Sequence, residues 1–168
     1  FEPRIVLMDE PLSALDKQLR ERMQIELRRL HEQLGTTTIY VTHDQREALT
    51  MSDRIAVIHR GRVQQIDVPQ ALYERPGNRF VAEFIGESSL VPVQVSGHDA
   101  RCGEHRWKLA EPAAAPGAAW LMLRPEHLRV LAPGSAAAAH ENTLVARVLA
   151  SVYQGESCLL QAELPDGR

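Results

Sequence analysis

Two adjacent carboxylates, Asp9 and Glu10, follow directly after an apolar run at residues 5–8. Burying one unpaired carboxylate is costly, and two neighbouring carboxylates also repel each other. A run this apolar is typical of a strand that is buried on both faces of a parallel sheet. His43 follows a second run, TTTIYVT, whose β-branched residues predict another buried strand. These three side chains are therefore candidates for one chemical site.

The ends of parallel strands are where such a site is expected. In an open parallel sheet, ligands bind beyond the carboxyl ends of the strands. If the two strands lie close together, Asp9, Glu10 and His43 can converge on one ligand. Carboxylate oxygen suits a hard divalent cation, and a carboxylate can also act as a general base. A plainer interpretation remains open, in which His43 is only a turn residue between a strand and a helix.

A long amphipathic helix is predicted between the two strands. Its apolar residues recur every three or four positions, and Gly35 is the expected stop: Leu15, Leu19, Met23, Leu27, Leu30 and Leu34. Ser13 followed by Asp16 is a capping-box pattern for the start of this helix. Asp44, with Glu47 three residues on, predicts the N-cap of a short helix over residues 44–49.

The remaining elements predict two domains, over residues 1–86 and 87–168. Residues 54–67 are expected to form two strands around a turn at Arg60-Gly61, and residues 69–86 two short helical pieces split at Pro76-Gly77. The fold class predicted is α/β followed by all-β: a parallel sheet with helices, then a small barrel or sandwich. The β segments are expected at residues 89–96, 101–109, 118–125, 128–132, 143–155 and 156–164, with a loop at 132–142.

Composition excludes several functional classes. The net charge of −3 implies no polyanion-binding surface. Cys102 and Cys158 form no disulfide framework or metal-ligand spacing, and are expected to be small buried apolar residues. Trp107, Trp120 and Tyr153 are expected in the core. There is no signal peptide, and no apolar run approaches the ~18 residues of a membrane span, so the sequence predicts a soluble, intracellular chain.

Three segments resemble one family in order and spacing. RIVLMDEP resembles the Walker B motif of ABC-type ATPases, LSALD the D-loop that follows it, and VTHDQREAL the segment with the switch histidine. The resemblance implies a partial P-loop NTPase fold that uses ATP and Mg²⁺. It implies that Asp9 holds Mg²⁺ through water, that Glu10 is the general base and that His43 contacts the γ-phosphate. Ser13 and Asp16 would face a partner subunit across the ATP site.

The rest of the chain narrows the resemblance. ALYERPGNRFVAEFIGE and LRPEHLRV resemble the junction and accessory domain of importer ATPases for polyamines, iron(III), sugars or sulfate, and are most similar to spermidine/putrescine importers. That likeness implies an OB-like β-barrel regulatory domain. It also implies a homodimer with permease subunits on the cytoplasmic side of the membrane, and indirect contact with a solute-binding protein.

One departure from the family is important. The sequence contains no G-x-x-x-x-G-K-[ST] loop and no LSGGQ-type signature. We therefore expect the chain to be the later part of a nucleotide-binding subunit with part of its regulatory domain, and to be inactive alone.

Two other functions stay open. The β part could act as a regulatory, dimerisation or small-ligand-sensing module. A non-transport ABC ATPase acting on nucleic acid is disfavoured, because that use calls for exposed aromatic residues along a basic groove.

Overall fold

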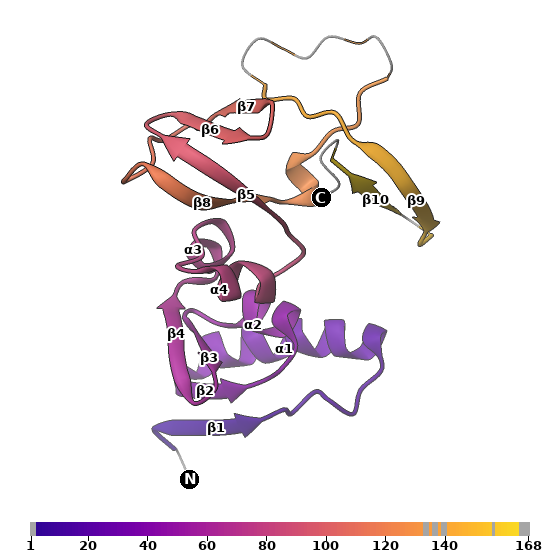
Figure 1. The fold of residues 1–168 in the computed structure, drawn as a ribbon. Coiled ribbons are helices and arrows are strands. Elements are labelled where there is room, and N and C mark those ends of the chain that lie inside the picture. The colour runs from indigo at the N-terminus through magenta and orange to yellow at the C-terminus, as the bar shows by residue number, and fades with distance from the viewer. Residues whose placement is uncertain (1–2, 133–134, 136–137, 139–140, 156, 165–168) are drawn as a thin grey trace. The chain divides into compact units, whose positions relative to one another are not determined.

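The computed structural model describes residues 3–132, 135, 138, 141–155 and 157–164 (Figure 1). The chain divides into two compact units, Phe1–Ser88 and Ser89–Arg168. The α-helices of the described residues all lie in the first unit. The second unit consists mainly of strands, which confirms the predicted change from α/β to all-β structure.

A parallel pair of strands opens the first unit. Strand β1 (Ile5–Asp9) pairs with β2 (Thr37–Val41), with Ile5 opposite Thr37 and Asp9 opposite Val41. Successive side chains alternate between exposed and half-buried, so that Ile5 is 57% exposed and Leu7 is 74% exposed. The prediction that both strands are buried on both faces is therefore wrong. Among the described residues, one face of the β1–β2 pair is half-buried and the other is exposed.

Helix α1 (Lys17–Leu34) connects the two strands and follows the predicted apolar spacing (Figure 1). Its N-cap is Asp16, whose side chain accepts a hydrogen bond from the Leu19 N–H at 2.9 Å. Gly35 ends the helix with a φ of 59° and donates its N–H to the His31 carbonyl, a left-handed cap that glycine adopts without strain. Ser13, the other predicted cap residue, bonds to Glu10 instead.

An antiparallel hairpin completes the strands of this unit. After helix α2 (Gln45–Met51), β3 (Ile55–His59) pairs with β4 (Arg62–Asp67). Arg60 and Gly61 both have positive φ, as a two-residue type I′ turn requires. The predicted hairpin is confirmed. The prediction of a continuous parallel sheet is wrong for β3, because its ladder is made with β4 and none of the described strands joins it to β2.

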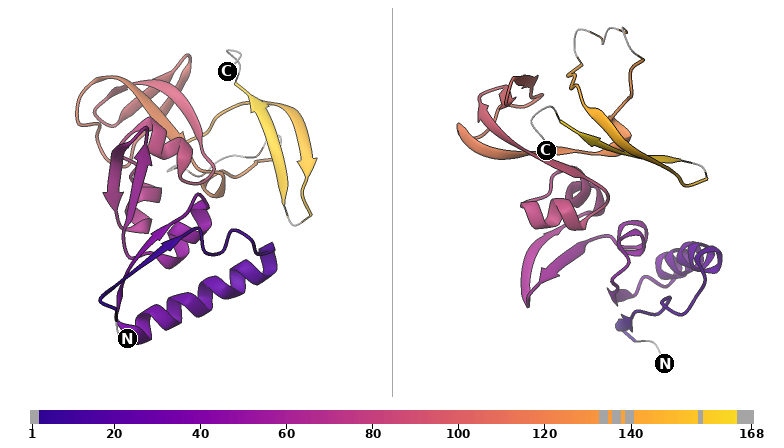
Figure 2. Two further views of the ribbon diagram at one scale, coloured as in Figure 1. Left: turned by 90° about the horizontal axis from the view of Figure 1, so that it is seen from below. Right: turned by 45° about the vertical axis from the view of Figure 1, so that its right-hand side comes forward.

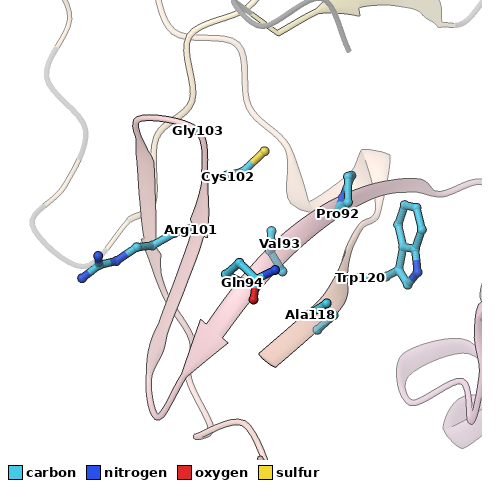
Figure 3. A pocket seen from close by; sticks show the side chains of 9 residues that line it. Pro92, Val93, Gln94, Arg101, Cys102, Gly103, Ala118 and Trp120 are labelled. Atoms are coloured by element: carbon cyan, nitrogen blue, oxygen red, sulfur yellow. The ribbon is translucent and has the colours of Figure 1, made fainter. Parts of the chain in front are cut away.

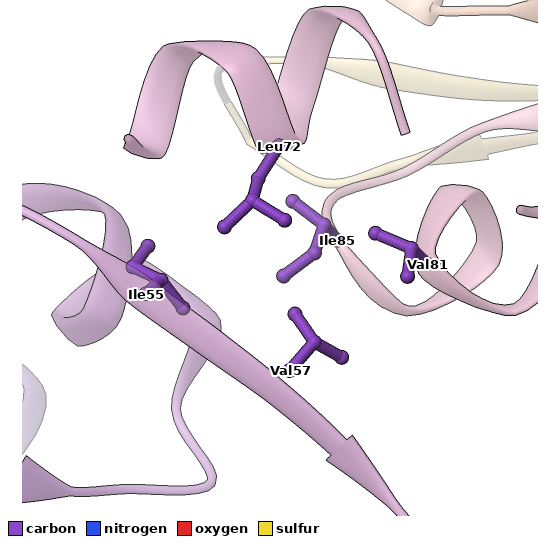
Figure 4. Close-up of a cluster of buried hydrophobic side chains, with 5 residues drawn as sticks. All are labelled: Ile55, Val57, Leu72, Val81 and Ile85. Atoms are coloured by element: carbon purple, nitrogen blue, oxygen red, sulfur yellow. The ribbon is translucent and has the colours of Figure 1, made fainter. Parts of the chain in front are cut away.

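The core of the first unit lies between this hairpin and two short helices, α3 (Pro69–Glu74) and α4 (Arg79–Phe84). Figure 4 shows its five buried side chains pointing toward one another: Ile55, Val57, Leu72, Val81 and Ile85. Leu72 and Val81 are 0% exposed. Two helical pieces around Pro76-Gly77 were predicted and are confirmed.

The second unit contains a four-stranded antiparallel sheet in the order β7-β6-β5-β8. Its strands are β5 (Ser89–Ser96), β6 (Asp99–Cys102), β7 (His105–Lys108) and β8 (Gly117–Leu123). A short 3₁₀ turn, η1 (Pro125–His127), is followed by a separate hairpin of β9 (Arg147–Tyr153) and β10 (Cys158–Glu163), drawn in yellow in Figure 2. The strand predicted at residues 128–132 does not form. The predicted loop at 132–142 lies partly outside the described residues.

Buried side chains on one face of the four-stranded sheet form the second core: Val91, Val93, Ala100, Cys102 and Trp107. The Trp107 indole N–H donates to the Thr143 carbonyl at 2.9 Å. The expected burial is confirmed for Trp107 and Cys102 but wrong for Trp120, Tyr153 and Cys158, which are exposed. In the described part of the chain, no helix is long and apolar enough to cross a membrane.

Candidate functional site

The candidate site lies where β1 and β2 end. Nδ1 of His43 lies 2.9 Å from Oε1 of Glu10. Because an ionised carboxylate only accepts hydrogen bonds, Nδ1 must carry the proton and donate it. The parallel register places Asp9 beside Val41, so that Glu10 and His43 leave the sheet at the same edge. The structure thus brings together two of the three residues that the sequence predicts at this site.

Charge at the site favours the protonated imidazole. The hydrogen bond to Glu10 and the negative charge of Glu10 raise the pKa of His43 above its ordinary value. Both side chains are accessible to solvent, with 75% of His43 and 44% of Glu10 exposed. An exposed pair of this kind adds little to stability. It does place a partial positive charge where an incoming anion could contact it.

Asp9 is the third predicted residue, and it is exposed at the last position of β1. It forms no hydrogen bond or ion pair with the described side chains. No group of three or more histidine, cysteine, aspartate or glutamate side chains able to hold a metal ion occurs among the described residues. Asp9 can therefore offer one carboxylate. That fits Mg²⁺, which commonly keeps several waters and binds one or two carboxylates together with phosphate oxygens.

The loop after β1 holds Glu10 in an unusual backbone conformation. Its φ is 44°, in the left-handed region that non-glycine residues rarely adopt. The Glu10 N–H donates to the Val41 carbonyl at 2.8 Å, which extends the β1–β2 ladder by one bond. The Glu10 carbonyl accepts bonds from both the N–H and the hydroxyl of Ser13. Ser13 and Asp16, predicted to face a partner subunit, are both used locally and both remain exposed.

The segment that carries His43 is fixed on both sides of the imidazole. Before it, the Thr42 hydroxyl accepts the Asp44 N–H at 2.9 Å. After it, Oδ1 of Asp44 accepts the N–H groups of Arg46 and Glu47. This confirms the predicted N-cap of α2. These bonds fix the backbone on both sides of His43.

A buried carboxylate beneath this segment was not predicted as part of a site. Glu47 is 2% exposed. Its Oε2 accepts hydrogen bonds from the Tyr40 hydroxyl at 3.0 Å and the Thr42 hydroxyl at 2.8 Å. Burial and the bond to Glu47 raise the pKa of Tyr40. Glu47 stands three residues after a helix cap, where glutamate is ordinary, so its position gave no sign of burial.

An apolar groove of about 710 Å³ runs beside the site. Its walls come from β2 and β3, including Tyr40 and Val57, and from the side of α1 that carries Leu27 and Leu30. His43 and Asp44 lie at its margin. The groove separates the parallel strand pair from the β3–β4 hairpin.

A second depression, of about 350 Å³, lies on the four-stranded sheet of the second unit. Figure 3 shows that its lining residues come from β5, β6 and β8, among them Pro92, Gln94, Arg101 and Trp120. They include no carboxylate or histidine that could serve in acid–base chemistry.

Comparisons with known proteins found similarity in both units of the chain. Residues 121–168 match the model of the TOBE domain. The spermidine/putrescine import ATP-binding protein PotA 1 of Pseudomonas aeruginosa is 44% identical, over 99% of this chain and 46% of that protein. The PotA proteins of Rubrobacter xylanophilus and Ruegeria pomeroyi are 44% and 42% identical, over 98% and 99% of this chain and 45% of each protein.

The chain spans about half the length of the curated relatives it matches. The similarity covers nearly the whole chain, including the candidate site and the all-β unit. It confirms the resemblance to spermidine/putrescine import ATP-binding proteins, and the TOBE match agrees with the predicted OB-like regulatory domain.

Proposed function

We propose that this chain is part of the energy-coupling ATPase subunit of an ABC importer, which hydrolyses ATP between two subunits to drive solute uptake. The observation that carries the proposal is the Glu10–His43 pair, 2.9 Å apart at the ends of adjacent parallel strands. The similarity to spermidine/putrescine import proteins supports polyamines as the solute. On this proposal, residues 1–86 belong to the nucleotide-binding domain and residues 87–168 to the regulatory domain.

In this role Glu10 acts as the general base. His43 occupies Oε1 of Glu10, and no described residue bonds to Oε2. That second oxygen is available to accept a proton from the attacking water. His43 keeps the carboxylate oriented through Nδ1, and its remaining ring nitrogen would contact the γ-phosphate of bound ATP. Its raised pKa favours the cation, which attracts an anionic substrate.

Asp9 is the proposed metal-binding residue of the site. It would hold Mg²⁺ through water, and the bound ion would offset the negative charge of the phosphates. Ser13 and Asp16 lie in the exposed loop after the site, where a second copy of the subunit could contact them. The other partners proposed are membrane permease subunits and, indirectly, a solute-binding protein, which would place the protein at the cytoplasmic face of the membrane.

The test uses the intact subunit assembled with its permease. We expect Glu10→Gln to bind ATP normally but to lose roughly 10²–10⁴-fold in turnover, the usual contribution of a general base. The matched control is Glu21→Gln, which changes an exposed carboxylate on α1. Cells that lack their own polyamine importer should take up labelled spermidine with the wild-type or Glu21→Gln subunit, and not with Glu10→Gln.

Two results would contradict the proposal. Near-normal ATP turnover by the Glu10→Gln subunit would remove Glu10 from the role of general base. Full ATPase activity with no uptake of spermidine or putrescine would leave the ATPase in place but exclude polyamines as the solute.

A further inference from the structure

Arg20, on the first turns of α1, reaches three separate parts of the candidate site. Its Nη2 donates to the Leu15 carbonyl at 2.9 Å, in the loop that follows Glu10. Its Nη1 donates to Oδ2 of Asp44 at 3.1 Å. Its Nε lies 3.7 Å from Oε1 of the buried Glu47. A single guanidinium therefore joins the loop after β1 to the segment that carries His43.

Two of the three partners of Arg20, Asp44 and Glu47, are tied to the backbone beside His43. Asp44 is the next residue in the chain, and its other oxygen caps α2. Glu47 accepts the hydroxyl of Thr42, the residue on the other side of His43. Glu47 needs a nearby cation because it is a carboxylate with 2% exposure. The described network contains no second arginine or lysine at Glu47.

His43 has no comparable anchor of its own. Its side chain is 75% exposed, and its bond to Glu10 is the one hydrogen bond it makes among the described residues. The position of its ring relative to Glu10 therefore depends on how the two segments are held together. Arg20 is the described side chain that spans both.

We propose that Arg20 is a positioning residue, which sets the Glu10–His43 contact by clamping the loop after β1 to the N-terminus of α2. The proposal rests on the function proposed above, because it assigns Arg20 to the same hydrolytic site. The planar guanidinium is required, because its rigid fork donates to the Leu15 carbonyl and to Asp44 at once while its Nε lies 3.7 Å from Glu47 without a hydrogen bond. A lysine ammonium is a compact point charge that does not reproduce this fork.

The structure offers a closely matched control in Arg28. This residue lies two turns further along α1 and also bridges to the α2 region, donating to the Met51 carbonyl and to Asp53, both at 2.9 Å. It pairs with Glu32 as well. Losing Arg28 should cost similar helix-to-helix contacts, but at the end of α2 that is remote from His43.

The main readout is the tautomer of His43 in the 168-residue chain without nucleotide. At about pH 9 histidine is neutral and glutamate is ionised, so the bond to Glu10 favours the Nδ1–H form, whereas a free imidazole favours Nε2–H. The ring ¹⁵N shifts report the ratio of the two forms, and a His43→Gln variant assigns the signals. Glu10→Ala gives the ratio when the contact is absent.

We expect Arg20→Met to move the tautomer ratio at least halfway from the wild-type value to the Glu10→Ala value, and Arg28→Met to leave it at the wild-type value. Arg20→Lys should shift the ratio in the same direction although it keeps the charge. Far-UV circular dichroism establishes which variants are folded, and Arg20→Lys carries the test if Arg20→Met is not. A wild-type ratio in either folded Arg20 variant, or an equal shift in Arg28→Met, overturns the proposal.

A second readout separates this inference from the proposed function. In the intact subunit, Arg20→Met should lower kcat roughly tenfold or more with the KM for ATP unchanged, while Arg28→Met changes neither. If the tautomer shifts but Glu10→Gln leaves turnover intact, the clamp exists and the proposed hydrolytic role is wrong. If the tautomer is unaffected while Glu10→Gln abolishes turnover, the function stands and the clamp does not.

Discussion

The bond from Tyr40 to the buried Glu47 gives a measurable consequence for stability. Tyr40→Phe removes one hydroxyl that donates to Oε2 of Glu47 at 3.0 Å and leaves the ring in place. Hydrogen bonds to charged groups contribute about 1.5–3 kcal/mol. Thr42 still donates to the same oxygen at 2.8 Å, so the carboxylate keeps a partner. We therefore expect the lower end, about 1.5 kcal/mol of the free energy of unfolding.

Because the helices and the tryptophans lie in different units, two spectroscopic signals can follow the unfolding of each unit separately. Helices α1 to α4 lie within residues 1–88, and both tryptophans of the chain, Trp107 and Trp120, lie in the second unit. In a urea titration, far-UV circular dichroism at the helix band reports the first unit and tryptophan fluorescence reports the second. Tyr40→Phe should lower the midpoint of the first signal and leave the second unchanged.

Tyr40→Phe should also change how the free energy of unfolding depends on pH in the alkaline range. The pKa of Tyr40 is raised in the folded chain, so the unfolded chain loses the phenolic proton first. The contribution of the Tyr40 hydroxyl to the free energy of unfolding is fully present below about pH 10, the ordinary pKa of tyrosine. It declines as the pH rises further, because the unfolded state then binds fewer protons than the folded state. Tyr40→Phe should flatten this decline.

The control is Tyr153→Phe, the same substitution at a side chain that is 79% exposed. It should change neither the urea midpoints nor the pH dependence in the alkaline range. An unchanged circular dichroism midpoint for Tyr40→Phe, or an equal change in Tyr153→Phe, would refute the view that the Tyr40 hydroxyl stabilises the Glu47 carboxylate.

Two further expectations concern the chain and its core. The purified 168-residue chain should show no Mg²⁺-dependent ATPase activity, because its sequence contains no G-x-x-x-x-G-K-[ST] loop to cradle the phosphates; activity that survives repurification and disappears in Glu10→Gln would show otherwise. Leu72→Ala, at a position with 0% exposure, should destabilise the first unit by about 2–5 kcal/mol, and a circular dichroism midpoint equal to wild type would contradict the described core.

Local elements were predictable because local chemistry decides them. The end of α1 at Gly35, the cap at Asp44 and the turn at Arg60-Gly61 each depend on residues within a few positions of one another. The Glu10–His43 contact was also predictable, since two apolar runs with polar ends follow the geometry of parallel strands.

Features that depend on distant packing were not predictable. Trp120 and Tyr153 have core-like side chains, yet they are 47% and 79% exposed. Leu7 belongs to an apolar run that predicts a core strand, and it is 74% exposed. Arg20 and Glu47 stand 27 positions apart, and no spacing rule along the chain links an arginine in one helix to a glutamate in another.

At Glu10, which has a left-handed backbone conformation, selection for stability and selection for transport should favour different residues. An L-residue in this region costs roughly 1–2 kcal/mol, which glycine avoids. A library of variants sorted for thermal robustness should therefore enrich glycine or asparagine at this position, whereas a library sorted for transport should retain glutamate. The position at which the two sorted libraries differ most in their preferred residue would then identify the reactive residue without a direct assay of ATP hydrolysis.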